Sequence, residues 1–219
     1  MAFTVLVYHD MPAFAAEKLA RSGIAVKRGL EPTEAGICRD IAGCSALIAF
    51  EQPERGFNRT IIDAAPELRL IARRGVGYET VDVDYAAEQG IPVTNVPTYG
   101  TASVSQFSIA LLLEVCHHIG HHDASVHAGR WAACADWCYW DYPLIELEGK
   151  TMGIIGFGRI GQAEGRVARA LGMKVLAYDV YPNDSGREIA EYVDLDALLA
   201  RSDVITLHCN LTPENTGFI

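Results

Sequence analysis

No stretch of the sequence is apolar for long enough to cross a membrane. The longest apolar run lies around Ile109–Leu113, whereas a spanning helix needs roughly 18 such residues. Met1–Tyr8 also lacks the charged segment, the long apolar segment and the small-residue cleavage site of a secretory signal. We therefore expect a cytoplasmic protein without a membrane partner.

Basic runs are missing as well. The 219 residues include 18 Lys and Arg against 28 Asp and Glu, which gives a formal net charge of −10. The basic residues are dispersed along the chain. Because an acidic surface repels phosphate backbones, we expect no nucleic-acid partner.

Cysteine pairs of the C-x-x-C kind are absent among the six cysteines. Cys44, Cys116 and Cys209 lie in apolar contexts, which favours free thiols over disulfides. Four histidines between His117 and His122 form two pairs with the spacing of metal ligands on a helix. We interpret them as the polar end of a helix and expect no resident metal, with adventitious binding of Ni²⁺ or Zn²⁺ as the alternative.

What the sequence does contain is a regular alternation of strands and helices. From Phe3 to Thr94 short β-branched runs alternate with helical segments, which is typical of a parallel α/β sheet. A long helix is then expected from about Ala102 to His121. Because it is apolar around most of its circumference, we expect it to be buried or sandwiched between units. The alternation resumes at Thr151, so we predict domain boundaries near Gly100 and Gly149.

Residues 123–148 show no clear period and contain all three tryptophans, Trp131, Trp137 and Trp140. Aromatic residues are enriched at protein interfaces. The segment is therefore either a local packing excursion or a subunit contact.

The stretch Thr151–Gly161 contains a G-x-G-x-x-G motif that follows a predicted strand and opens a predicted helix. Gly156 permits a sharp turn, Gly158 lets a pyrophosphate approach the backbone, and Gly161 lets the helix pack closely on the strand. The helix N-terminus near Arg159 and Ile160 offers free amides and a positive dipole end to a phosphate. The motif in this context predicts a dinucleotide site.

Asp179 ends the next predicted strand, Lys174–Tyr178. A carboxylate at this position accepts hydrogen bonds from the adenosine ribose hydroxyls and repels a 2′-phosphate, which favours NAD over NADP. A helix over Leu195–Ala200 and a strand over Asp203–His208 would then complete one nucleotide-binding half. In the N-terminal region, Glu51 follows a predicted strand, Ala46–Phe50. Ligands bind at the carboxyl ends of parallel strands, so Glu51 either contacts the substrate or belongs to a solvated loop.

Four blocks of sequence identify a family: RRGVGYETVD (Arg73–Asp82), NVPTYGTASVSQ (Asn95–Gln106), LEGKTMGIIGFGRIGQ (Leu147–Gln162) and SDVITLHCNLTPENTG (Ser202–Gly217). With these blocks the chain resembles the D-isomer-specific 2-hydroxyacid dehydrogenases, most closely those known as glycerate dehydrogenase or hydroxypyruvate reductase. The resemblance implies a flavodoxin-like substrate domain over residues 1–100 and an interdomain helix with a dimerisation arm over 101–149. It further implies the first half of a Rossmann NAD-binding domain over 150–219, with the active site in the cleft between the two domains.

The resemblance also implies roles for individual residues. The backbone of Gly75, Val76 and Gly77 would meet the carboxylate of a small 2-hydroxy or 2-oxo acid. The cofactor would be NAD, lined by Val104, Gly156, Gly158, Arg159, Ile160, Gly161, Asp179, His208 and Cys209. We interpret His208 as a cofactor-lining residue, with a catalytic role as the alternative. The family implies a homodimer built through residues 101–149.

The family's catalytic arginine, carboxylate and histidine lie downstream of the position of Ile219. We therefore expect no catalytic residue in this chain, weak NAD binding and no turnover. Two alternatives stay open: a non-catalytic NAD-binding dimeric scaffold or co-repressor-like protein, and a dehydrogenase of the same superfamily that acts on formate or phosphite.

Overall fold

The computed structural model describes residues 3–49 and 56–219. Contacts divide the chain into two compact units, Met1–Tyr99 and Gly100–Ile219. The helix that follows Gly100 groups with the second unit. Glu51, a candidate substrate contact, lies outside the described residues.

The first unit is a five-stranded parallel sheet with the strand order β2-β1-β3-β4-β5. This is the flavodoxin-like order expected for the unit. Its strands are β1 (Thr4–Val7), β2 (Ala25–Arg28), β3 (Ala46–Ala49), β4 (Leu70–Arg73) and β5 (Val93–Thr94). Its helices are α1 (Ala13–Arg21), α2 (Glu34–Ile41), α3 (Arg59–Asp63) and α4 (Val83–Glu88).

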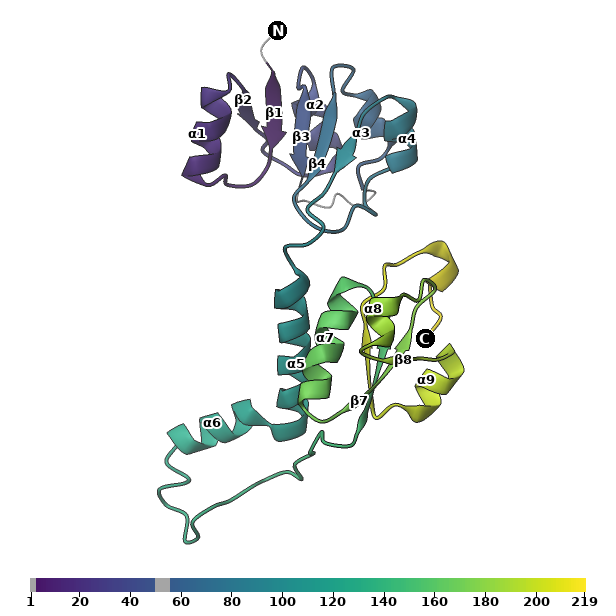
Figure 1. Cartoon of the computed structure of the whole chain (residues 1–219). Helices are drawn as coiled ribbons and strands as arrows, with labels where there is room; N and C mark the ends of the chain where they lie inside the picture. Colours follow the sequence, from purple (N-terminus) through teal and green to yellow (C-terminus); the bar gives the residue numbers. More distant parts are fainter. Residues whose placement is uncertain (1–2, 50–55) are drawn as a thin grey trace. The chain divides into compact units, whose positions relative to one another are not determined.

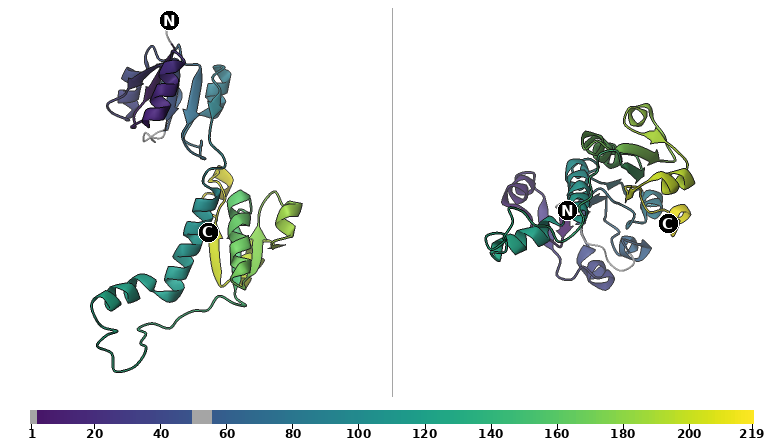
Figure 2. Two further views of the ribbon diagram at one scale, coloured as in Figure 1. Left: turned by 60° about the vertical axis from the view of Figure 1, so that its left-hand side comes forward. Right: turned by 90° about the horizontal axis from the view of Figure 1, so that it is seen from below.

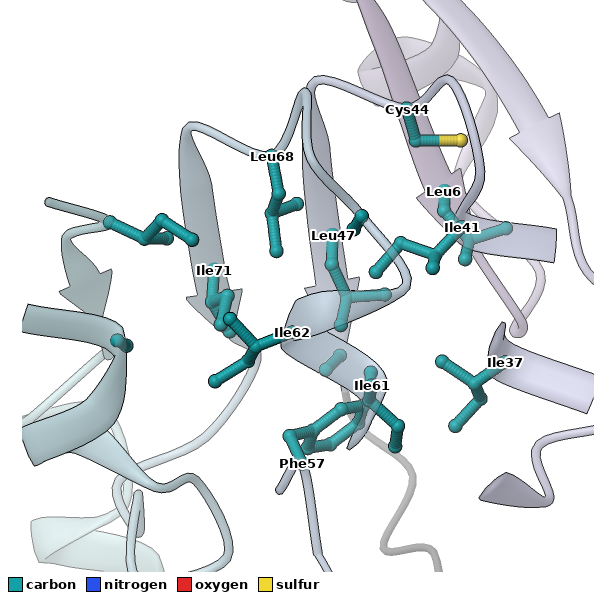
Figure 3. Packing of buried hydrophobic residues seen from close by; sticks show 14 of the residues in the cluster. Leu6, Ile37, Ile41, Cys44, Leu47, Phe57, Ile61, Ile62, Leu68 and Ile71 are labelled. Atoms are coloured by element: carbon teal, nitrogen blue, oxygen red, sulfur yellow. The ribbon is translucent and has the colours of Figure 1, made fainter. Parts of the chain in front are cut away.

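The core of the first unit lies mainly on one face of this sheet. Successive strand residues point to opposite faces. Leu6, Leu47 and Ile71 therefore share one face, where isoleucines of α2 and α3 cover them (Figure 3). A smaller cluster around Val5, Val7 and Ala46 occupies the other face.

The second unit is a four-stranded parallel sheet with the order β8-β7-β6-β9. Its strands are β6 (Thr151–Ile155), β7 (Lys174–Tyr178), β8 (Glu191–Tyr192) and β9 (Val204–Leu207). Its helices are α5 (Thr101–His117), α6 (Ile119–His127), α7 (Arg159–Ala170), α8 (Asp184–Arg187) and α9 (Leu195–Arg201), followed by the short 3-10 helix η1 (Pro213–Asn215).

The strand order corrects one feature of the sequence interpretation. The sequence does not predict the two-residue strand β8, and its alternation therefore makes the strand over Asp203–His208 the third strand of the unit. It is the fourth, β9, and it pairs with β6 on the side opposite to β7. The order is thus that of a Rossmann fold, and the connection reverses direction between β6 and β9, where open α/β sheets bind their ligands.

Helices cover both faces of the second sheet. Met152, Ile154 and Val175 pack on one face with Ile109 and Cys116 of α5 and Ala168 of α7. Leu198 of α9 packs on the other face, against Ile155 and Leu176. Helices α5 and α7 lie side by side (Figures 1 and 2).

The expected single helix from Ala102 to His121 is wrong. The helix ends at His117, and α6 starts at Ile119 with its axis bent by 64°. His118 adopts a left-handed conformation at the break, with φ 50° and ψ 45°, a region in which histidine is enriched. The Glu114 carboxylate accepts a hydrogen bond from the Gly120 amide, at 3.1 Å from one of its oxygens, and so satisfies a free donor at the start of α6.

The break also changes two other expectations. His117 and His121 no longer share one helix, and among the described residues no group of three or more His, Cys, Asp and Glu is arranged to hold a metal ion. The apolar circumference of α5 is not buried all round, because Phe107 and Val115 are 65% and 66% exposed.

In the described chain no single helix has the length and apolarity to cross a membrane. Helices α5 and α6 reach these limits only when they are taken together as a bent pair.

Residues 128–150 form neither helix nor strand and return the chain from α6 to β6 (Figure 2). The Asp141 carboxylate fastens this segment to α6 through His121, whose Nε2 lies 2.6 Å away, and it also accepts hydrogen bonds from Arg130 of the same segment, one of them at 2.6 Å. The hydrogen bonds from Arg130 and His121 hold the pKa of the Asp141 carboxyl far below its usual range. We call residues 128–146 the arm from here on.

Candidate functional site

The glycine-rich turn follows directly on β6. Gly156 has a φ of +87°, a conformation that side chains of L-residues rarely adopt. A Cβ atom on Gly156 would lie 2.3 Å from the Cys209 amide nitrogen and 2.5 Å from the His208 carbonyl carbon. Glycine is therefore needed here for two reasons. The turn requires a positive φ, and the end of β9 lies where a Cβ atom would be.

The other two glycines have different surroundings. A Cβ on Gly161 would lie 2.4 Å from the Gly156 carbonyl oxygen, so this glycine provides the close helix–strand approach that the motif predicts. A Cβ on Gly158 would meet nothing within 4 Å. Gly158 also has extended backbone angles, φ −77° and ψ −152°, so its φ does not require glycine. No contact within the protein requires a glycine at this position. A ligand that approaches the backbone closely would require one.

Helix α7 begins directly beside this open position. Gly158 is its N-cap residue and supplies no side-chain hydrogen bond to the first turn. The first amides of a helix have no partner within the helix, and they carry a partial positive charge. Arg159 and Ile160, the first two residues of α7, thus lie at the helix end that favours an anion, such as the pyrophosphate of a dinucleotide.

Asp179 lies at the end of β7 and braces the turn. One carboxylate oxygen accepts from the Phe157 amide at 2.6 Å, and the other accepts from the Tyr181 amide at 2.8 Å. Each carboxylate oxygen can accept a further hydrogen bond. Asp179 can therefore hold the glycine turn and still receive ribose hydroxyl groups.

Gln162 is a residue of the site that the sequence interpretation missed. Its buried side-chain amide donates to the Phe157 carbonyl at 2.9 Å and to Asn183 Oδ1 at 3.2 Å. Asn183 in turn accepts from the Gly186 amide at 2.9 Å and caps α8. Gln162 thus links the glycine turn to the segment that follows Asp179. No periodic signal marks it, because a buried polar residue is recognised only by its partners.

His208 and Cys209 form the wall against which Gly156 packs. The His208 amide donates to the Ile155 carbonyl at 2.7 Å and continues the ladder between β9 and β6. The His208 side chain turns toward Glu164 of α7, with Nε2 2.7 Å from Oε2, and is only 7% exposed. Only the backbone of His208 is therefore available to a ligand. Cys209, the next residue, is exposed.

Glu164 is fully buried, at 0% exposure. Its carboxylate also accepts hydrogen bonds from Thr206 Oγ1 at 2.6 Å and from the Ser108 hydroxyl. Burial raises the pKa of the Glu164 carboxyl. The hydrogen bonds from His208, Ser108 and Thr206 together lower it by more than burial raises it, so the pKa lies below its ordinary value. Glu164 is thus an ionised carboxylate inside the second unit.

The candidate substrate loop lies in the first unit, after β4. The Gly75 carbonyl accepts from the Val96 amide at 2.9 Å, the Val76 carbonyl from Asn95 Nδ2 at 2.7 Å, and the Gly77 carbonyl from Arg73 Nε at 3.4 Å. In a trans peptide the N–H group points opposite to the preceding carbonyl. The amides that follow these carbonyls therefore point away from the groups that fasten the loop.

The structure thus brings most of the candidate cofactor residues together at the carboxyl end of β6. Gly156, Gly158, Gly161, Asp179 and the backbone of His208 and Cys209 surround the start of α7. Val104 lies on α5 and is partly exposed.

Comparisons with known proteins give a consistent picture. Residues 109–219 match the family model described as "D-isomer specific 2-hydroxyacid dehydrogenase, NAD binding domain". Hydroxypyruvate reductase of Blautia hydrogenotrophica is 60% identical over 162 residues, which cover 74% of this chain and 50% of that protein. Glycerate dehydrogenase of Methylorubrum extorquens is 41% identical over 154 residues, or 70% of this chain and 47% of that protein.

Solved structures agree. The apo structure of D-lactate dehydrogenase from Escherichia coli superposes with a TM-score of 0.75 and 30% identity, covering 99% of this chain and 68% of that one. D-lactate dehydrogenase from Aquifex aeolicus, complexed with NAD and lactic acid, gives a TM-score of 0.81 and 27% identity, with coverage of 96% and 62%. The chain spans about half the length of the curated relatives it matches.

Proposed function

The chain belongs to the D-isomer specific 2-hydroxyacid dehydrogenase family, and we propose that it binds NAD(H) and serves the interconversion of a D-2-hydroxy acid with its 2-oxo acid. The observation that carries the proposal is Gly158. This glycine has ordinary backbone angles and open space beside it, and it lies at the start of a helix whose first turn has no side-chain cap. A Cβ at this position would fill the space that a pyrophosphate needs.

The cofactor residues have separate tasks in this proposal. The first amides of α7, at Arg159 and Ile160, bind the pyrophosphate. Asp179 accepts the ribose hydroxyls, and its negative charge disfavours a 2′-phosphate. Val104 lies near the nicotinamide, and the His208–Cys209 backbone lies beside the adenosine half. When bound, the nicotinamide supplies the hydride chemistry.

For the substrate, we propose a small 2-oxo acid held by its carboxylate at the loop of Gly75, Val76 and Gly77. The loop supports this because its three carbonyl groups accept hydrogen bonds from Val96, Asn95 and Arg73, and the amide that follows each carbonyl points away from that donor. The names of the relatives favour hydroxypyruvate and glycerate, with glyoxylate as a neighbouring substrate. We assign no proton transfer to His208, because its side chain is buried against Glu164.

A direct test is calorimetric titration of the chain with NADH and with NADPH. We expect NADH to bind, and NADPH to bind at least tenfold more weakly because of Asp179. Absence of NADH binding up to millimolar concentration would refute the proposal. Because we expect no catalytic residue in this chain, hydroxypyruvate, glyoxylate and pyruvate are ranked by calorimetric titration into the chain loaded with NADH. Oxidation of NADH with any of them, followed at 340 nm, would overturn that expectation and exclude a non-catalytic scaffold.

We also propose that a second copy of the chain covers the outer face of α5. Phe107, Leu111 and Val115 follow one another at helical spacing and are more than half exposed, as are Trp137 and Trp140 of the arm. An apolar stripe of this kind is typical of a subunit interface. Analytical ultracentrifugation should give a dimer that Leu111→Glu dissociates. A wild-type monomer at micromolar concentration would contradict this part of the proposal.

A further inference from the structure

No role has yet been assigned to Glu164, which is the most deeply buried charged side chain among the described residues. It lies on α7, the helix whose first turn faces the proposed pyrophosphate. A buried carboxylate persists in a protein only where donors replace its lost water. The position of these donors in the fold therefore shows what the carboxylate holds together.

The three donors come from three separate parts of the second unit. Ser108 lies on α5, Thr206 lies on β9, and His208 follows the end of β9. Thr206 and His208 both donate to Oε2, at 2.6 and 2.7 Å, whereas Ser108 donates to Oε1. The carboxylate thus ties α7 to α5 on one side and to the end of β9 on the other.

The end of β9 is also the wall of the glycine turn. A Cβ on Gly156 would touch the His208 carbonyl carbon and the Cys209 amide nitrogen. The His208 amide is bonded to Ile155, the last residue of β6. The side chain that Glu164 holds and the backbone on which the turn rests thus belong to the same residue.

We propose that Glu164 is a positioning residue for the dinucleotide site: its carboxylate accepts the Nε2–H proton of His208 and fixes the His208–Cys209 backbone against Gly156. This inference rests on the proposed function, because it deepens the same site. It assigns to His208 the tautomer with the proton on Nε2. Glu164 itself does not touch the ligand and acts only through His208.

Two substitutions separate this role from general stability. Glu164→Gln keeps an acceptor oxygen for Thr206 and His208, and its amide group can donate to the Ser108 hydroxyl, which also accepts. Glu164→Leu has a similar volume but leaves three donors without an acceptor. We expect NADH affinity to fall at least tenfold in the leucine variant and less than threefold in the glutamine variant.

Glu191→Leu is the matched control. Glu191 lies on β8 and forms an ion pair with Arg201, with both nitrogen–oxygen distances at 2.9 Å. The same chemical change at an exposed carboxylate that pairs with Arg201 of α9 should leave NADH affinity unchanged. Urea unfolding of each variant identifies the conditions in which all of them are folded, and affinities are compared there.

Nuclear magnetic resonance gives a readout that does not depend on NADH. In the wild type, imidazole ¹⁵N shifts should show the His208 proton on Nε2. The amide resonances of Gly156 and Cys209 should move in Glu164→Leu and stay nearly in place in Glu164→Gln and in the control. If Glu164→Leu fails to fold, His208→Leu leaves the carboxylate its two other donors and carries the same expectations.

The outcomes separate the two proposals. A wild-type chain that does not bind NADH refutes the proposed function. Unmoved Gly156 and Cys209 amides in Glu164→Leu refute the positioning role by themselves, whether or not NADH binds. Unchanged NADH affinity in Glu164→Leu likewise overturns it, as does a loss of affinity in Glu164→Gln as large as that in the leucine variant.

Discussion

Replacement of Gly158 by alanine separates the demands of the ligand from those of the fold. The added methyl group meets no protein atom within 4 Å, and the negative φ is open to alanine. The fold should therefore tolerate the change. Because alanine restricts the unfolded chain, the free energy of unfolding should stay constant or rise by about 0.4–1 kcal/mol.

The affinity for NADH should nevertheless fall. The methyl group occupies space that the pyrophosphate needs, and it keeps the phosphate from at least one amide of the first turn of α7. Hydrogen bonds to charged groups contribute about 1.5–3 kcal/mol each. Loss of one of them weakens binding roughly 10- to 150-fold, at about 1.4 kcal/mol per factor of ten.

Gly156→Ala is the contrasting variant. Its φ of +87° and the close approach of the Cys209 amide make alanine strained there. The left-handed conformation alone costs about 1–2 kcal/mol for a residue with a Cβ, and displacement of the β9 end adds to this. Calorimetry with NADH and urea unfolding of both variants form the assay. Wild-type affinity in Gly158→Ala, or wild-type stability in Gly156→Ala, would refute the reasoning.

Three further predictions concern other parts of the second unit. Asp179→Asn loses one of its two backbone bonds and its charge, so calorimetry should show NADH binding weakened about tenfold and a smaller preference for NADH over NADPH; equal preference in both proteins would contradict the role. Glu114→Ala removes the acceptor for Gly120 at the start of α6 and should lower the free energy of unfolding in urea by about 1 kcal/mol, whereas no change would mean that the break at His118 holds without it. The Asp141 carboxyl has a depressed pKa, so its contribution is complete above its unfolded pKa of about 4 and is lost as the pH falls below that value. Acid titration of tryptophan fluorescence should therefore show a transition of the arm that Asp141→Asn lacks, and identical titrations would exclude the Asp141 contacts as its cause.

The features that the sequence predicted correctly are those encoded locally. The three glycines, the strand before them and the helix after them lie within a dozen residues, so spacing alone specifies the turn and the approach of α7. The alternation of strands and helices likewise predicted the parallel sheet of the first unit, and the family resemblance implied its flavodoxin-like order. In these cases each residue's environment is set by its near neighbours.

The features that the sequence did not predict depend on distant partners. Strand β8 has two residues, which is too short for a period to appear. Helix α5 ends at His117, where the His118 ring packs on Tyr142 of the arm with a centroid distance of 4.5 Å. Glu164 looks like a surface residue of a helix until its donors are known, and these lie 42 to 56 residues away in the chain.

The contact of Gly156 with His208 and Cys209 has a consequence for the order in which the protein is made. About 50 residues separate Gly156 from its wall, and at a synthesis rate of roughly 5–20 residues per second this interval lasts about 3–10 s. During that time β6 has left the ribosome with β7 beside it, while the edge that β9 will cover stays open. An open strand edge can pair with the wrong partner. The free edge of β6 is therefore exposed to misassembly until β9 emerges, and the glycine turn takes its final shape only then.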